Sequence, residues 1–174
     1  MKVVSVPDLV FALASGATAA PADDTADPKL RWMWIADLYG HPNWGLGSTV
    51  PSFSRLCADD IATVCRDTAS GIATVDDWRR IDQVAHRGLD STDDLAAASY
   101  AWLAVIDTAT DAFDHLAGVA FAGVEAIADA WMAVCTAHSS ERASQIVEAA
   151  LLAWVNASGV PLCYRPTLTI WRTA

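Results

Sequence analysis

Five acidic side chains recur along one stretch of the sequence at spacings that place them on the same side of a helix. They lie within residues 91–138, a run that is rich in alanine and free of proline. At 100° per residue they form one stripe, while large apolar residues occupy the other side. Carboxylates gathered in this way inside a helical bundle hold metal ions, and His115 would be a further donor. The stripe consists of Asp107, Asp111, Asp114, Glu125 and Asp129.

The spacing favours a simpler interpretation of this stripe. Di-iron bundles use Glu-x-x-His pairs on two helices, and the sequence contains no such pair. Carboxylates on one side of an amphipathic helix usually form its solvated face. Acidic doublets such as Asp76-Asp77 fall in predicted first helical turns, where negative charge complements the helix dipole. We therefore interpret the stripe as solvent-facing and expect neither a metal nor a cofactor.

Histidine and cysteine give no readable catalytic pattern. No two of the four histidines are three or four residues apart, and no Cys-x-x-Cys occurs. Cys57 and Cys65 are eight residues apart on one predicted helix, which separates them by roughly 12 Å and prevents a disulfide. We expect Cys57, Cys65, Cys135 and Cys163 to be free thiols, most of them buried. A nucleophile paired with a histidine would have to be assembled by the fold, so the catalytic residues stay unknown.

The best candidate for a binding site is the loop from Tyr39 to Ser48. It combines glycines with a tyrosine, a histidine, an asparagine and a tryptophan, an unusual mixture for a connection. With the tryptophans of the preceding helix it would form an aromatic pocket or a protein-contact patch; alternatively, Trp44 folds back over the core. Gly45-Leu46-Gly47 lacks the lysine and spacing of a phosphate loop. The expected ligand- or partner-binding residues are Trp32, Trp34, Tyr39, His41, Asn43, Trp44 and Trp171.

Helical periodicity and capping signals define the elements that must position these residues. Asp27-Pro28 starts a helix and Gly40 ends it, and this helix is apolar almost all the way round, as a central helix would be. Thr74 with Asp77 forms a capping box, and Gly88 is expected to end that helix. The predicted helices cover residues 6–15, 28–40, 52–70, 75–87, 91–138 and 139–156.

The 91–138 stretch is expected to contain a break. One helix over this length would span about 70 Å, which is too long for a domain of this size. The expected break lies near Asp107–Asp111 or at Gly118, which leaves either one interrupted helix or two nearly collinear ones.

Length and composition predict a single packed domain. The chain has 174 residues, of which 53% are hydrophobic, and it has eight tryptophans. That composition is well above the disordered range. We predict an all-α fold in which residues 1–174 form a single-domain irregular bundle of six or seven helices. A mobile loop is expected at 17–27 and a short extended C-terminal tail at 160–174.

Charge limits the classes of partner. The net charge of −10 would repel nucleic acid and anionic membranes. The sequence has no apolar run long enough for a membrane-spanning helix. The first residues resemble a secretory signal, but Pro7 and Asp8 interrupt the apolar run, so a cytoplasmic location is the favoured interpretation.

Together these features favour a small acidic protein that works by binding another protein or by self-association. An inhibitor, an immunity-type protein or an accessory subunit would fit, with the acidic surface steering a basic partner. The alternative is an enzyme or small-ligand binder whose aromatic pocket lies inside the bundle. A purely structural role in an assembly is a third possibility.

Overall fold

The computed structural model describes residues 27–93, 96–119 and 123–158. Within these ranges the regular secondary structure is all helical, so the predicted all-α class is confirmed. The predicted helix over 6–15, the loop at 17–26, the extended tail and Trp171 lie outside the described residues. The helices are α2 (Pro28–Gly40), α3 (Leu46–Thr49), α4 (Arg55–Ala69), α5 (Val75–Asp90), α6 (Ala97–Leu116), α7 (Val124–Ala137) and α8 (Ser140–Ser158).

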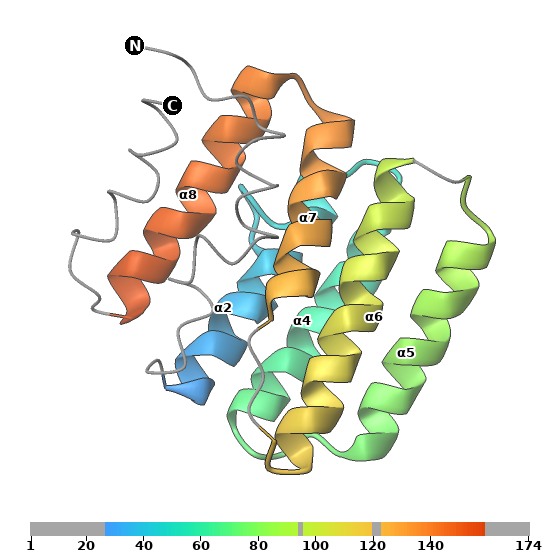
Figure 1. The fold of residues 1–174 in the computed structure, drawn as a ribbon, viewed down its shortest axis with the longest axis vertical. Coiled ribbons are helices and arrows are strands. Elements are labelled where there is room, and N and C mark those ends of the chain that lie inside the picture. The colour runs from blue at the N-terminus through green and yellow to red at the C-terminus, as the bar shows by residue number, and fades with distance from the viewer. Residues whose placement is uncertain (1–26, 94–95, 120–122, 159–174) are drawn as a thin grey trace.

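The long helices form an irregular bundle in which successive members run in opposite directions (Figure 1). Helix α2 packs mainly on α4 and also meets α8, while α6 lies between α5 and α7. The segment from α2 through α3 to α4 and the turn between α7 and α8 are at one end of the bundle. The turn that joins α4 to α5 and the C-terminal end of α6 are at the other end.

Helix α2 occupies the central position predicted from its apolar sequence. Asp27 caps its start by accepting a hydrogen bond from the backbone N–H of Lys29 at 3.0 Å, and Pro28 follows in the first turn. The helix ends at Gly40, as expected. Most of its side chains are buried, because α4 and α8 pack against it. Its buried residues are Arg31, Trp32, Trp34, Ile35, Ala36, Leu38 and Tyr39.

The expected break within residues 91–138 is present, but the expected arrangement of the two parts was wrong. The stretch folds back into the antiparallel pair α6 and α7 instead of two nearly collinear helices (Figure 1). The break follows Leu116, so of the two predicted positions Gly118 is correct and Asp107–Asp111 is not. Gly118 and Gly123 have φ angles of +76° and +69°, which suit glycine and allow the chain to reverse.

Two helices also have ends that differ from the predicted ones. Helix α5 continues through Gly88 to Asp90, so that Ser91 follows α5 instead of capping the next helix. A Cβ on Gly88 would lie 2.2 Å from the Trp102 ring, so this glycine allows α5 to pack closely on α6 rather than ending a helix. Helix α4 begins at Arg55, three residues after the predicted start, with Ser54 as its cap. Leu56, in the first turn of α4, is 82% exposed.

Large aromatic side chains fill the core between the helices. Trp32, Trp78, Trp131 and Trp154 are fully buried and come from four different helices. The three described cysteines, Cys57, Cys65 and Cys135, are free thiols. Burial raises the pKa of Cys135 to about 11 and that of Cys65 further, so both thiols are poor nucleophiles at neutral pH.

No helix among the described residues combines the length and the apolar character needed to cross a bilayer.

Candidate functional site

Four of the aromatic residues proposed for binding belong to the core. Trp34 stacks on Trp44 at a centroid distance of 6.2 Å and meets Trp131 and Trp154 edge-on. The indole N–H of Trp34 donates to the carbonyl oxygen of Ala150 at 2.9 Å. These contacts fix α2 to α8 and leave the Trp34 and Trp44 rings buried. The alternative prediction, in which Trp44 folds back over the core, is therefore the correct one.

Trp32 and Tyr39 are also fully buried, on other sides of α2. Trp32 packs against the Trp78 ring at 5.6 Å and the His115 ring at 5.7 Å. The Tyr39 hydroxyl and that of Thr108 on α6 are hydrogen-bonded at 2.6 Å. Neither aromatic side chain is open to solvent for a ligand or partner.

The other two described candidates, His41 and Asn43, lie in the connection after α2. The His41 ring stacks on the Trp44 ring with centroids 4.5 Å apart. Its Nδ1 accepts a hydrogen bond from the backbone N–H of Asn43 at 3.2 Å. This arrangement holds the Asn43 side chain in an exposed position beside the core. Among the described predicted site residues, Asn43 lines the pocket that is described below.

Close backbone approach fixes the shape of this connection. The backbone N–H of Gly45 donates to the carbonyl oxygen of His41 at 3.0 Å. A Cβ on Gly45 would lie 2.5 Å from the backbone nitrogen of His41 and 2.8 Å from the carbonyl oxygen of Tyr39. Glycine at this position is therefore a packing requirement. The chain then forms the short helix α3, in which the Thr49 hydroxyl donates to the carbonyl oxygen of Gly45 at 2.8 Å.

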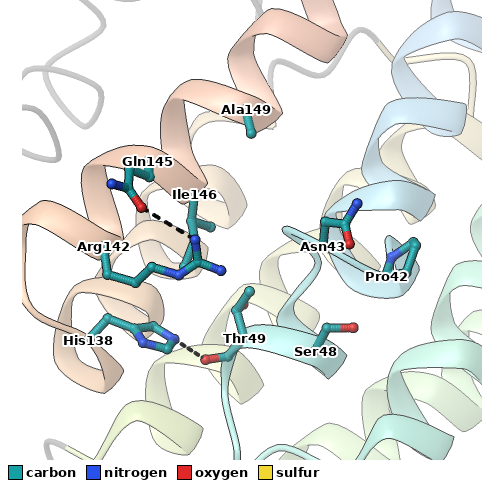
Figure 2. A pocket seen from close by; sticks show the side chains of 9 residues that line it. All are labelled: Pro42, Asn43, Ser48, Thr49, His138, Arg142, Gln145, Ile146 and Ala149. Atoms are coloured by element: carbon teal, nitrogen blue, oxygen red, sulfur yellow. Dashed lines mark hydrogen bonds between the residues drawn. The ribbon is translucent and has the colours of Figure 1, made fainter.

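The connection and α8 face each other across an open pocket of about 420 Å³ (Figure 2). One wall is a single face of α8, because its four residues follow helical spacing. The opposite wall comes from the α2–α3–α4 segment, and His138 at the end of α7 lies between the walls. The lining residues are Pro42, Asn43, Ser48, Thr49, His138, Arg142, Gln145, Ile146 and Ala149.

Two hydrogen bonds organise the pocket. His138 Nε2 is hydrogen-bonded to the carbonyl oxygen of Thr49, which ties the end of α7 to the opposite wall. Because a carbonyl oxygen only accepts, the proton of this bond is on Nε2. Arg142 extends from α8 towards the wall that carries Asn43, and its Nη1 donates to Gln145 Oε1 at 3.4 Å (Figure 2).

The charge of the pocket is opposite in sign to the net charge of the chain. The chain carries 21 acidic residues against 11 lysines and arginines, yet none of the nine lining residues is acidic. Arg142 contributes a permanent positive charge, and Asn43, Ser48 and Gln145 contribute neutral hydrogen-bonding groups. Ligand pockets have volumes of about 300–1,000 Å³. This site is thus suited to a ligand that carries negative charge.

Sequence reasoning found one wall of the pocket and missed the other. Asn43 and Ser48 lie in the loop that was singled out, whereas Arg142 and Gln145 were treated only as part of the last helix. The available signal was the spacing of Arg142, Gln145, Ile146 and Ala149, which defines a polar and apolar stripe on α8. That signal does not reveal that the loop after α2 faces this stripe.

The interpretation of the acidic stripe as solvent-facing was correct only in part. Asp114 and Glu125 are exposed, but Asp107, Asp111 and Asp129 are partly buried where α6 packs against α7. Burial and the charges of Glu125, Asp107 and Asp114 raise the pKa of Asp111 to about 7, although Arg31 opposes this.

The pKa of Asp129 is likewise raised to about 7, by burial, by its hydrogen bond with Asp107 and by the charges of Asp107 and Glu125. Burial also raises the pKa of Asp107. Part of the stripe therefore carries protons near neutral pH. Within the described ranges, the structure brings together no set of three or more His, Cys, Asp or Glu side chains that could hold a metal ion.

Comparisons of the chain with known protein families, with curated proteins and with solved structures find no match. The function is therefore argued from the pocket and its residues.

Proposed function

We propose that the protein works by binding a protein partner, and that the pocket between α8 and the α2–α3–α4 segment is the centre of the contact surface. The observation that carries this proposal is an open pocket with an arginine and no carboxylate on a chain of net charge −10. A cation that has no ion-pair partner among the described residues is available for another molecule.

The contents of the pocket support binding over catalysis. General acid–base catalysis needs a titratable group aimed at the substrate, and nucleophilic catalysis needs a nucleophile bonded to a base. In this pocket His138 Nε2 is engaged by the carbonyl oxygen of Thr49, and no hydrogen bond joins His138 to Ser48. The lining also contains neither a carboxylate nor a cysteine. These side chains can recognise a ligand, but they do not form a catalytic pair.

The surroundings of the pocket suit a macromolecular partner. Leu56, at the start of α4, is 82% exposed, and Arg55 next to it approaches Gly47 in α3. An exposed leucine at the start of the helix that follows α3 can provide the apolar contact that protein interfaces need. The net charge of −10 would speed the approach of a basic partner at low ionic strength. Self-association through the same end of the bundle is the alternative form of this proposal.

Site-specific crosslinking tests the proposed surface. A photo-crosslinking residue at Asn43, on the pocket wall, should give a discrete and saturable adduct in extracts of the source cells. Excess unlabelled wild-type protein should compete for this adduct, and Arg142→Glu protein should not. The same crosslinker at Gln83, exposed on α5, is the control. Equal labelling from both positions would contradict the proposal, whereas an adduct of twice the chain mass would identify self-association.

A further inference from the structure

The pocket has the size and lining of a site for an organic anion. A volume of about 420 Å³ is far larger than a single inorganic ion needs. Pro42 and Ala149 add exposed apolar surface, with the buried Ile146 beneath it, to a lining that otherwise consists of hydrogen-bonding side chains. An occupant that fills this space has both a charged group and a short apolar body.

We propose that the pocket binds the carboxylate of such a ligand, with Arg142 as the main cation and with Asn43 and Gln145 as further donors. This inference rests on the proposed function and specifies the chemistry of the group that the partner inserts. A chain-terminal carboxylate with its last apolar side chain has this chemistry, and so does a small free carboxylic acid. The apolar body would lie against the exposed Ala149 and above the buried Ile146.

Arg142 is the residue that carries the inference. Three other arginines each form an ion pair with an aspartate, with N–O distances of 3.5 Å for Arg66, 2.9 Å for Arg79 and 2.8 Å for Arg80. Among the described residues, no carboxylate lies within ion-pair distance of Arg142, and its one side-chain partner is the neutral Gln145. Its planar guanidinium suits a carboxylate, which can accept two parallel hydrogen bonds from it.

The lining also excludes the opposite class of ligand. A cationic group is usually held by a carboxylate or by the face of a Trp, Tyr or Phe ring, and none of the nine lining residues is of these types. A bare phosphate is usually bound by several cationic or backbone donors, whereas the pocket has one arginine. A carboxylate with an apolar body fits the lining better than either.

A matched pair of probes tests this assignment by NMR. N-acetyl-leucine and N-acetyl-leucine amide have the same apolar body and differ in the carboxylate. The acid should shift the side-chain NH₂ signals of Asn43 and Gln145 in a saturable way, and the amide should bind at least tenfold more weakly, because a charge-assisted pair is worth about 1.5–3 kcal/mol. Inorganic phosphate should not saturate these shifts.

Substitutions at Arg142 complete the test. Arg142→Gln should weaken binding of the acid about tenfold or more, and Arg142→Lys should have an intermediate effect, because it keeps the charge and loses the planar fork. Arg87→Gln changes the net charge equally on exposed α5 and should leave binding unchanged. Arg142 is exposed, and an unchanged NMR spectrum away from the pocket will show that the variant is folded.

The outcomes separate this inference from the proposed function. Equal shifts from the acid and the amide would overturn the carboxylate assignment but leave the pocket as a binding site. No shift at Asn43 or Gln145 with either probe would also overturn the assignment, while crosslinking from Asn43 decides the proposed function independently. A short peptide that ends in leucine, compared with its amidated form, identifies the source. Tighter binding of the free-ended peptide than of N-acetyl-leucine indicates a chain terminus, and equal binding indicates a small acid.

Discussion

Charged side chains are in opposite situations in the pocket beside α8 and between α6 and α7. In the pocket a single arginine stays exposed, without an ion-pair partner among the described residues. Between α6 and α7, three aspartates are partly buried, and burial together with the charge of Glu125 raises the pKa of each. The first region keeps a charge available, and the second removes charge by binding protons.

This difference separates the proposed recognition site from a structural contact. An exposed arginine contributes little to folding, because water solvates it in both states. Partly buried carboxylates with raised pKa values change the stability of the fold with pH, because the folded state binds more protons than the unfolded chain. Substitutions in the two regions should therefore affect different measurements.

The largest effect is expected at Gly45, on which the loop wall of the pocket depends. Gly45→Ala places a Cβ within 2.5–2.8 Å of backbone atoms of His41 and Tyr39, so the loop must move. We expect the free energy of unfolding to fall by about 3 kcal/mol and binding of N-acetyl-leucine to be lost, as measured by urea denaturation and NMR titration. Gly71→Ala is the control: it has open space and a φ of +72°, so it should cost only about 1 kcal/mol. Equal costs at the two glycines would show that the loop is not tightly packed.

The second prediction concerns the pH dependence of stability. An unfolded aspartate titrates near pH 4, whereas Asp111 and Asp129 titrate at about 7 in the fold. The folded state thus binds extra protons between these values, and their stabilising effect is lost as the pH rises through 7. With allowance for solvent screening of partly buried groups, the free energy of unfolding should fall by about 2 kcal/mol from pH 4.5 to pH 8.

Single substitutions locate the source of that slope. Asp111→Asn and Asp129→Asn should each stabilise the protein by about 1 kcal/mol at pH 8 and have little effect at pH 5. Asp59→Asn, an exposed site on α4, makes the same change in net charge and should leave the slope unchanged. A slope that persists in the double variant Asp111→Asn/Asp129→Asn would mean that other groups control the pH dependence.

A third, smaller effect is expected at Thr108, which links α6 to α2 near the acidic cluster. Thr108→Val removes the partner of the buried Tyr39 hydroxyl and should cost about 1–2 kcal/mol, measured by urea denaturation. Thr110→Val is a matched control, because the Thr110 hydroxyl donates to the carbonyl oxygen four residues earlier, as that of Thr108 does, but is exposed. Similar costs for both threonines would show that the Tyr39 contact adds no stability.

The smallest effect on stability is expected in the pocket. Arg142→Gln should change the free energy of unfolding by less than about 0.5 kcal/mol, because the side chain is exposed and unpaired. A loss above 1 kcal/mol in thermal or urea denaturation would instead place Arg142 among the residues that hold α8 in position.

The sequence predicted the elements better than their arrangement. The caps at Asp27 and Thr74 and the apolar character of α2 are local signals, and the helices they predicted are present. Gly88 was misread because its role, close approach of α5 to Trp102 on α6, depends on a tertiary contact. Part of the acidic stripe was misread for the same reason. A helical projection shows which residues share a face, but it does not show that α7 folds back along α6 and covers part of that face.

The candidate site shows the same limit. The mixture of residue types in the loop after α2 directed attention to Asn43, which does line the pocket. The aromatic residues around it were selected for the same reason, yet burial places Trp32, Trp34, Tyr39 and Trp44 in the core. Arg142 is about 100 positions away along the chain, and only the packing of α8 beside α2 and α7 brings it to the loop.

The most direct test of the account is a measurement of where the apolar body of a bound carboxylate lies. Isotope-edited NOE spectra of the complex with N-acetyl-leucine should show contacts from the leucine methyl groups to the side chains of Ile146 and Ala149. The same contacts should be absent from the Arg142→Gln protein at the same ligand concentration. NOEs to residues outside the pocket, or contacts that persist unchanged without the arginine, would contradict the assignment of this pocket as a carboxylate-binding site.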